Sequence, residues 1–129
     1  MTGPGPASRA ALLRRRCSVP LAADESVRSP AEALAVIEAD AADVLNVKLA
    51  KMGVRMALET IALARAAGKG LMIGCMQESA LGLSMSVHLA CGMGAFSFAD
   101  LDSDYLLAEG QPRGFFRRQG PLLLIASGA

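Results

Sequence analysis

The chain has 129 residues, of which 53% are hydrophobic and 19% charged, with a formal net charge of +1. This is enough for one domain with a buried core, and thirteen basic against twelve acidic residues argue against a nucleic-acid partner. The one basic run, residues 14–16, is interpreted as a solvated helix end. Cys17, Cys75 and Cys91 have no metal-like spacing, which indicates buried thiols in a reducing, cytoplasmic setting.

Both ends of the chain are expected to lie outside the folded part. Residues 1–6 contain two prolines and predict a loose tail, residues 126–129 a second tail, and residues 7–125 the folded domain. No apolar core of a secretory signal follows the first arginines. Residues 79–99 carry no formal charge, but serines, His88 and glycines interrupt them, so we predict a buried helix, a loop and a strand rather than a membrane span.

Predicted helices and strands alternate along the chain. Ser29 as N-cap, Pro30 at the first helical position and Glu32 at capping-box spacing predict a helix that reaches residue 39. The other helices are expected over residues 7–16, 54–67 and 80–90, and the strands over residues 19–23, 44–49, 71–73 and 95–99. This alternation predicts an α/β fold with parallel strands and right-handed crossovers.

Residues 44–49 are expected to form a buried strand, yet this strand ends in a lysine. Since alternate strand residues share a face, Asn46 and Lys48 are expected to point one way, and Val47 and Leu49 toward a covering helix. Barrels of the α/β type place their chemistry at the carboxyl ends of the strands. The alternative is a lysine that simply extends into water at the end of a strand.

Polar residues follow each predicted strand, so one edge of the sheet is expected to collect them. They are Asp24, Glu25, Lys48, Gln77, Glu78, Asp100 and Asp102.

Three segments resemble the carboxyl-terminal half of the barrel domain in the enolase superfamily, muconate-lactonising subgroup. They are Pro-Leu-Ala-Ala-Asp-Glu-Ser at 20–26, Asn-Val-Lys-Leu-Ala-Lys-Met-Gly at 46–53 and Gly-Cys-Met-Gln-Glu-Ser at 74–79. Asp-Leu-Asp at 100–102, followed by Leu-Leu-Ala-Glu at 106–109, is most similar to the L-Ala-D/L-Glu dipeptide epimerases. The resemblance implies a partial (β/α)8 barrel of about four βα units, corresponding to barrel strands five to eight. It also implies an isomerase that removes a proton alpha to a carboxylate.

The resemblance further implies roles for individual residues. Asp24 would be one of three carboxylates that bind Mg²⁺, and Lys48 one of two lysines on opposite sides of the substrate α-carbon. Asp100 and Asp102 would hold the free ammonium of a dipeptide. The implied lining residues without an assigned role are Gln77 and Glu78.

Elementary chemistry agrees with these roles. Removing the α-proton creates an enediolate, whose charge a divalent cation stabilises. A lysine that acts as a base must be partly neutral, so a nearby cation or burial is expected to lower the pKa of Lys48. Two carboxylates around one ammonium form charge-assisted hydrogen bonds. Without the resemblance, residues 100–104 would be interpreted as an exposed acidic turn.

Several features of the family have no counterpart in this sequence. The only lysines are Lys48, Lys51 and Lys69, so an earlier Lys-x-Lys motif is missing, together with two metal-binding carboxylates and a capping domain. We therefore expect a fragment that self-associates or docks onto a missing barrel half. The alternatives are a cycloisomerase of the same superfamily, a non-catalytic remnant or interaction module, and a small membrane protein built on residues 79–99.

Overall fold

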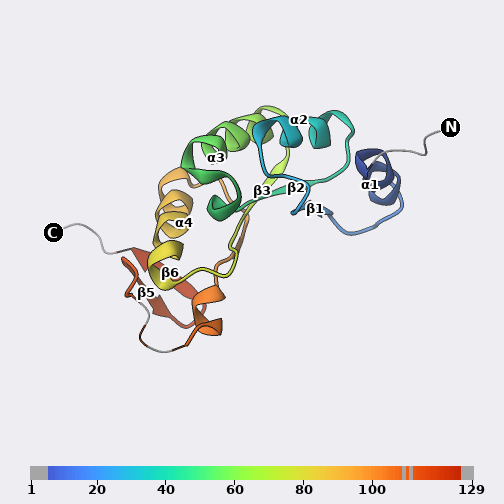
Figure 1. Ribbon diagram of the computed structural model, residues 1–129. Helices are drawn as coiled ribbons and strands as arrows, with labels where there is room; N and C mark the ends of the chain where they lie inside the picture. The colour runs from blue at the N-terminus through green and yellow to red at the C-terminus, as the bar shows by residue number, and fades with distance from the viewer. Residues whose placement is uncertain (1–5, 109, 111, 126–129) are drawn as a thin grey trace.

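A four-stranded parallel sheet forms the centre of the computed structural model, which describes residues 6–108, 110 and 112–125 (Figure 1). Its strands lie side by side in chain order: β1 (Ala22–Ala23), β2 (Val44–Val47), β3 (Gly70–Gly74) and β4 (Phe98–Asp100). The predicted α/β class and the parallel pairing are therefore confirmed.

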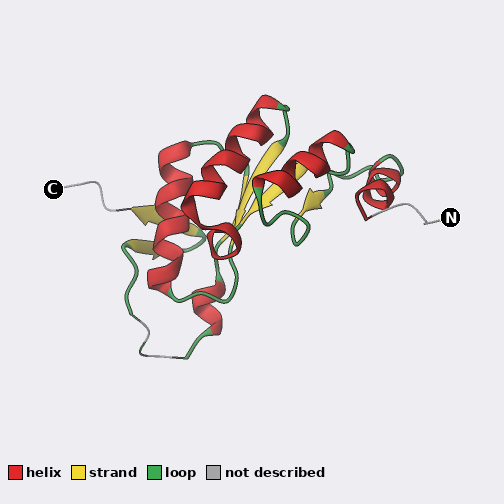
Figure 2. Cartoon of the chain, turned by 45° about the horizontal axis from the view of Figure 1, so that its top comes forward, coloured by secondary structure: helices red, strands yellow, loops and turns green. Residues whose placement is uncertain are grey.

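Helices connect successive strands and lie along one face of the sheet (Figure 2). They are α2 (Pro30–Glu38), α3 (Leu49–Ala66) and α4 (Ala80–Met93). Two further elements lie at opposite ends of the sheet (Figure 1): α1 (Pro6–Arg14) beside β1, and an antiparallel hairpin of β5 (Phe116–Gln119) and β6 (Leu122–Ile125) beside α4. A short 3-10 helix, η1 (Ser103–Leu106), follows β4.

The start of α2 follows the capping signal in the sequence. The Ser29 hydroxyl accepts a hydrogen bond from the Glu32 amide at 3.2 Å, and Pro30 occupies the first turn. The Glu32 carboxylate in turn accepts from the Arg28 amide at 2.7 Å, one residue before the N-cap. These bonds satisfy backbone donors at the helix start and fix where the chain leaves β1.

Alternation along the strands divides the sheet into a covered and an uncovered face. Leu45, Val47, Leu71 and Ile73 point toward the helices and are at most 2% exposed, with Leu45 beside Leu71 and Val47 beside Ile73. They form the centre of the core. The opposite face carries Phe98, which is 52% exposed, although Val44 and Asn46 on the same face are only 6% and 3% exposed.

The segment around Lys48 differs from its expected structure. Strand β2 ends at Val47, and Lys48 is the N-cap of α3, so Leu49 packs from a helix rather than from a strand. Helical structure begins at Leu49, but Gly53 (φ 71°, ψ 173°) is not helical and marks a kink where two helical segments of α3 meet. The helix predicted over residues 54–67 corresponds to the segment after this kink, and the short segment before it was not expected. Lys48 thus lies at a junction between a strand and a helix.

The other predicted helices and strands are confirmed with shifted boundaries. Strand β1 is shorter than residues 19–23, and β4 begins three residues later than expected, so Asp100 lies within the strand. Of the expected tails, all residues except Pro6 lie outside the described part, and Pro6 begins α1. Cys91 is exposed and Cys17 and Cys75 are half-buried, contrary to the expected burial of all three thiols. Within residues 6–108, 110 and 112–125, no helix has the length and apolar character needed to cross a membrane.

Candidate active site

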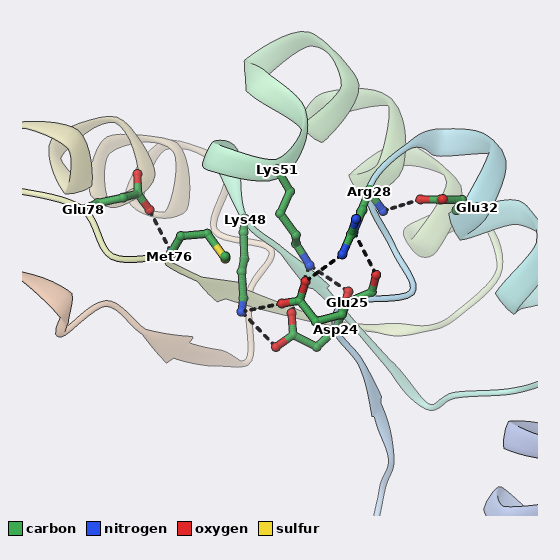
Figure 3. A network of polar contacts seen from close by, with 8 residues as sticks. All are labelled: Asp24, Glu25, Arg28, Glu32, Lys48, Lys51, Met76 and Glu78. Carbon is green, nitrogen blue, oxygen red and sulfur yellow. Dashed lines mark hydrogen bonds and ion pairs between the residues drawn. The ribbon is translucent and has the colours of Figure 1, made fainter. Parts of the chain in front are cut away.

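One carboxylate is shared by two ammonium groups where β1 and β2 end (Figure 3). Asp24 follows β1, and its Oδ2 lies 2.9 Å from the Nζ of Lys48. Lys51 lies one helical turn further along α3, and its Nζ donates to Asp24 Oδ1 at 2.9 Å and to the Asp24 backbone carbonyl at 2.7 Å. Glu25 Oε1 lies 3.4 Å from the Nζ of Lys48. The cluster therefore joins the ends of two neighbouring strands.

The two lysines are much more buried than their acidic partner. The side chains of Lys48 and Lys51 are 11% and 5% exposed, whereas that of Asp24 is 41% exposed. A lysine that merely extended into water would keep its ammonium in solvent. The ion-paired geometry of Lys48 contradicts that alternative.

The electrostatics of the cluster favour its charged form. Burial lowers the pKa of Lys48, but the hydrogen bond to Asp24 and the charges of Asp24 and Glu25 outweigh burial, so the pKa lies above its usual value of 10.5. Burial raises the pKa of Asp24, and hydrogen bonds from Lys48 and Lys51 bring it below its usual value of 3.8. The expected lowering of the Lys48 pKa is therefore wrong for this arrangement, because acceptors rather than cations surround the amine. Lys48 can donate a proton as it stands, and it must leave Asp24 and lose that proton before it can accept one.

The chain's own carboxylates do not form a complete magnesium site. The described residues hold no group of three or more histidine, cysteine, aspartate or glutamate side chains able to bind a metal ion. Asp24 and Glu25 are both paired with lysines, whereas Mg²⁺ requires an ordered octahedron of oxygen ligands. These residues alone do not fit the ion, and Asp24 could supply only one of several ligands.

A buried amide lies beside the cluster. Asn46 is 3% exposed, and its Oδ1 has no hydrogen-bond partner among the described residues. Gly74 of β3 makes room for it, since a Cβ at position 74 would lie 2.6 Å from this oxygen. The close approach explains why a glycine ends β3.

Asp100 lies at the same level of the sheet as Lys48. Gly74 pairs with Asp100, and extending the β2–β3 register by one residue places Lys48 opposite Gly74. Two strand spacings separate the backbones of Lys48 and Asp100, which is about 10 Å. Asp100 and Asp102 are exposed, and in the described part of the chain their carboxylates have no hydrogen-bond or ion-pair partner.

The two remaining predicted lining residues do not reach the lysine. Gln77 is exposed, and the Glu78 carboxylate accepts a hydrogen bond from the Met76 amide at 3.1 Å. Figure 3 shows Glu78 apart from the Asp24 cluster. The Glu78 side chain therefore shapes the loop after β3.

Comparison with known proteins identifies the family of the chain. Residues 4–120 match the model of the enolase C-terminal domain-like family. The chain belongs to this family. The L-Ala-D/L-Glu epimerase of Thermotoga maritima is 45% identical over 106 residues, which are 82% of this chain and 31% of that protein.

Solved structures of family members have a similar fold. The L-Ala-D/L-Glu epimerase from Bacillus subtilis, in a substrate-liganded complex, has a TM-score of 0.89 and 28% identity over 93% of this chain and 34% of its own. The dipeptide epimerase from Methylococcus capsulatus, complexed with Mg and the dipeptide L-Arg-D-Lys, has a TM-score of 0.80 and 34% identity over 95% of this chain and 36% of its own. The chain thus spans about a third of the length of these enolase-superfamily barrels, and its sheet is part of such a barrel.

One residue of the ion-pair cluster was not expected from the sequence. The strand pattern of residues 44–49 does not single out Lys51, although its spacing from Lys48 places the two amines on one face of a helix start. That signal depends on α3 beginning at Leu49, whereas the helix was expected only after Gly53.

Proposed function

We propose that this chain supplies the carboxyl-terminal part of a magnesium-dependent dipeptide epimerase, an isomerase that exchanges the proton alpha to a carboxylate. The observation that carries the proposal is the buried, ion-paired Lys48 at the carboxyl edge of a parallel sheet, level with the unpaired Asp100. Relatives named as dipeptide epimerases support it. A cytoplasmic location is proposed from the cysteine pattern of the sequence alone.

Four residues of the candidate site have specific roles in this proposal. Lys48 exchanges the α-proton on one face of the substrate, and a second base from outside this chain serves the other face. Asp100 and Asp102 receive the substrate ammonium through charge-assisted hydrogen bonds. Asp24 would supply one ligand to a Mg²⁺ ion whose other ligands would come from the rest of the barrel, and such an ion would supply Lewis-acid stabilisation of negative charge on the substrate carboxylate.

The unpaired aspartates favour a dipeptide over the cycloisomerase alternative. A substrate without an ammonium would leave Asp100 and Asp102 with no partner of opposite charge, and like charges close together repel. An N-terminal ammonium matches both carboxylates. This is why a dipeptide is proposed as the substrate.

The test is a chimera in which this chain replaces the matching third of the Thermotoga maritima enzyme. L-Ala-L-Glu incubated with the chimera in heavy water is expected to gain deuterium at the glutamate α-carbon and to form L-Ala-D-Glu. Circular dichroism and gel filtration would establish that the chimera folds like its parent. A folded chimera that incorporates no deuterium would contradict the proposal.

A further inference from the structure

Ser103 joins the loops that follow β3 and β4. It is 3% exposed and begins η1. Its hydroxyl accepts a hydrogen bond from the Glu78 amide at 3.1 Å and donates one to the Glu78 carbonyl at 3.0 Å. A single buried hydroxyl thus satisfies both backbone groups of one residue in the neighbouring loop.

Arg118 holds the same segment from the hairpin. Its Nη2 donates to the Leu101 carbonyl at 2.7 Å, and its Nε donates to Asp104 Oδ2 at 3.2 Å. A further hydrogen bond joins Nη2 to Asp104 Oδ1. The guanidinium carbon lies 4.4 Å from the ring centroid of Tyr105, which restricts the arginine from another side.

Asp102 lies between these fixed points and remains free. Leu101 and Ser103 flank it and are 6% and 3% exposed, whereas Asp102 is exposed. With Asp100 and Arg118, it lines a cavity of about 430 Å³ between α4, β4 and the hairpin. Arg118 also lines this cavity, but its Nε and Nη2 are directed to Asp104 and the Leu101 carbonyl, and in the described part of the chain it forms no ion pair with Asp102.

We propose that Ser103 and Arg118 are positioning residues that set the substrate preference of the site. They fix the backbone on both sides of Asp102, while Asp104 keeps the arginine from pairing with it. The Asp102 carboxylate is thereby left available for a cationic group. The inference rests on the proposed function in so far as that group is the ammonium of a dipeptide.

The test titrates the full chain, labelled with ¹³C at its aspartate carboxyl carbons, with L-Ala-L-Glu and with its N-acetyl derivative. The carboxyl signals of Asp100 and Asp102 should shift with the free dipeptide and not with the acetylated one. Arg118→Gln and Ser103→Ala should each weaken this response about tenfold, because each removes hydrogen bonds that hold the loop. Arg118→Lys should be intermediate, since an ammonium cannot reproduce the forked donor geometry.

Matched controls separate positioning from general destabilisation. Arg117→Gln changes the exposed neighbour on the same strand, and Ser97→Ala changes an exposed serine before β4; both should respond like the unchanged chain. Unchanged affinity in Arg118→Gln and Ser103→Ala, equal shifts with the acetylated peptide, or no shift at Asp102 would overturn the inference. A normal carboxylate response from a chain whose chimera shows no α-proton exchange would instead support the inference and contradict the proposed function.

Discussion

Asp43 joins three segments of the chain through one carboxylate. It accepts from the Leu21 amide at 2.9 Å and from the Nε of Arg14 at 2.8 Å. The hydrogen bond from Leu21, and then the one from Arg14, hold the pKa of Asp43 below its usual value of 3.8. The charged carboxylate thus fastens α1 and the chain before β1 to the start of β2.

A pH dependence of stability follows from this pKa. A carboxyl group with a lower pKa in the folded than in the unfolded chain stabilises the fold above its unfolded pKa, and this contribution disappears as the pH falls through the folded pKa. The free energy of unfolding, measured with urea, should therefore decrease between pH 7 and pH 3. Asp43→Asn should reduce this decrease, and Glu38→Gln, at an exposed carboxylate of α2, should not. An identical decrease in Asp43→Asn and the unchanged chain would contradict the assignment.

Single residues show how far the sequence could predict the site. Alternation in residues 44–49 and the polar residues after each strand led to Lys48 and Asp24, and the structure brings these two together. The direction of the Lys48 pKa was wrong because it depends on Asp24 and Glu25, which reach the lysine only when β1 pairs with β2. The pairing of β1 with β2 is a contact between segments far apart in the sequence, so the local sequence pattern does not predict it.

The backbone conformation at position 53 of α3 explains why a glycine stands there. Gly53 adopts φ 71° and ψ 173°, a conformation that side chains essentially exclude. Gly53→Ala should therefore lower the free energy of unfolding by about 2 kcal/mol. Gly92→Ala in α4 is the matched change, since no atom lies within 4 Å of the added carbon and φ is not positive; it should raise stability by about 0.5 kcal/mol. Chemical denaturation measures the free energy of unfolding of both variants. A change of the same sign in Gly53→Ala and Gly92→Ala would contradict this account.

Among the elements, the capping signal predicted α2, and the alternation of helix and strand patterns predicted α4 and the parallel strands; neither predicted the β5–β6 hairpin. The pattern of residues 116–125 does not predict strands, although Gly120 and Pro121 form a two-residue turn between Gln119 and Leu122. A four-residue strand pair of mixed polarity gives a weak pattern. The position of the hairpin depends on tertiary contacts, such as the hydrogen bond from Arg118 to the Leu101 carbonyl after β4, which the local sequence does not predict.

The whole chain exposes surface that a closed barrel would cover. The sheet is open, with β1 and β4 at its edges, and its helices lie along one face (Figure 2). Open edges and uncovered apolar side chains favour association. The isolated chain should therefore self-associate, and light scattering should give a molar mass above that of a monomer. Phe98→Ser, on the uncovered face, should weaken association, whereas Phe115→Ser, in the loop before β5, should not. A monomeric peak for the unchanged chain, with cooperative unfolding, would contradict the prediction.

The central claim is that Lys48 exchanges the α-proton on one face of the substrate. Deuterium incorporation from heavy water should be followed separately from L-Ala-L-Glu and L-Ala-D-Glu in the chimera. Lys48→Met should reduce exchange from one epimer at least about 100-fold and leave exchange from the other. Lys69 forms an ion pair with Asp40 at 2.7 Å and directly precedes β3, at the amino-terminal end of that strand. Lys69→Met should therefore leave both exchange rates unchanged. The claim would be contradicted if, for each epimer, Lys48→Met and the unchanged chimera exchanged the α-proton at the same rate.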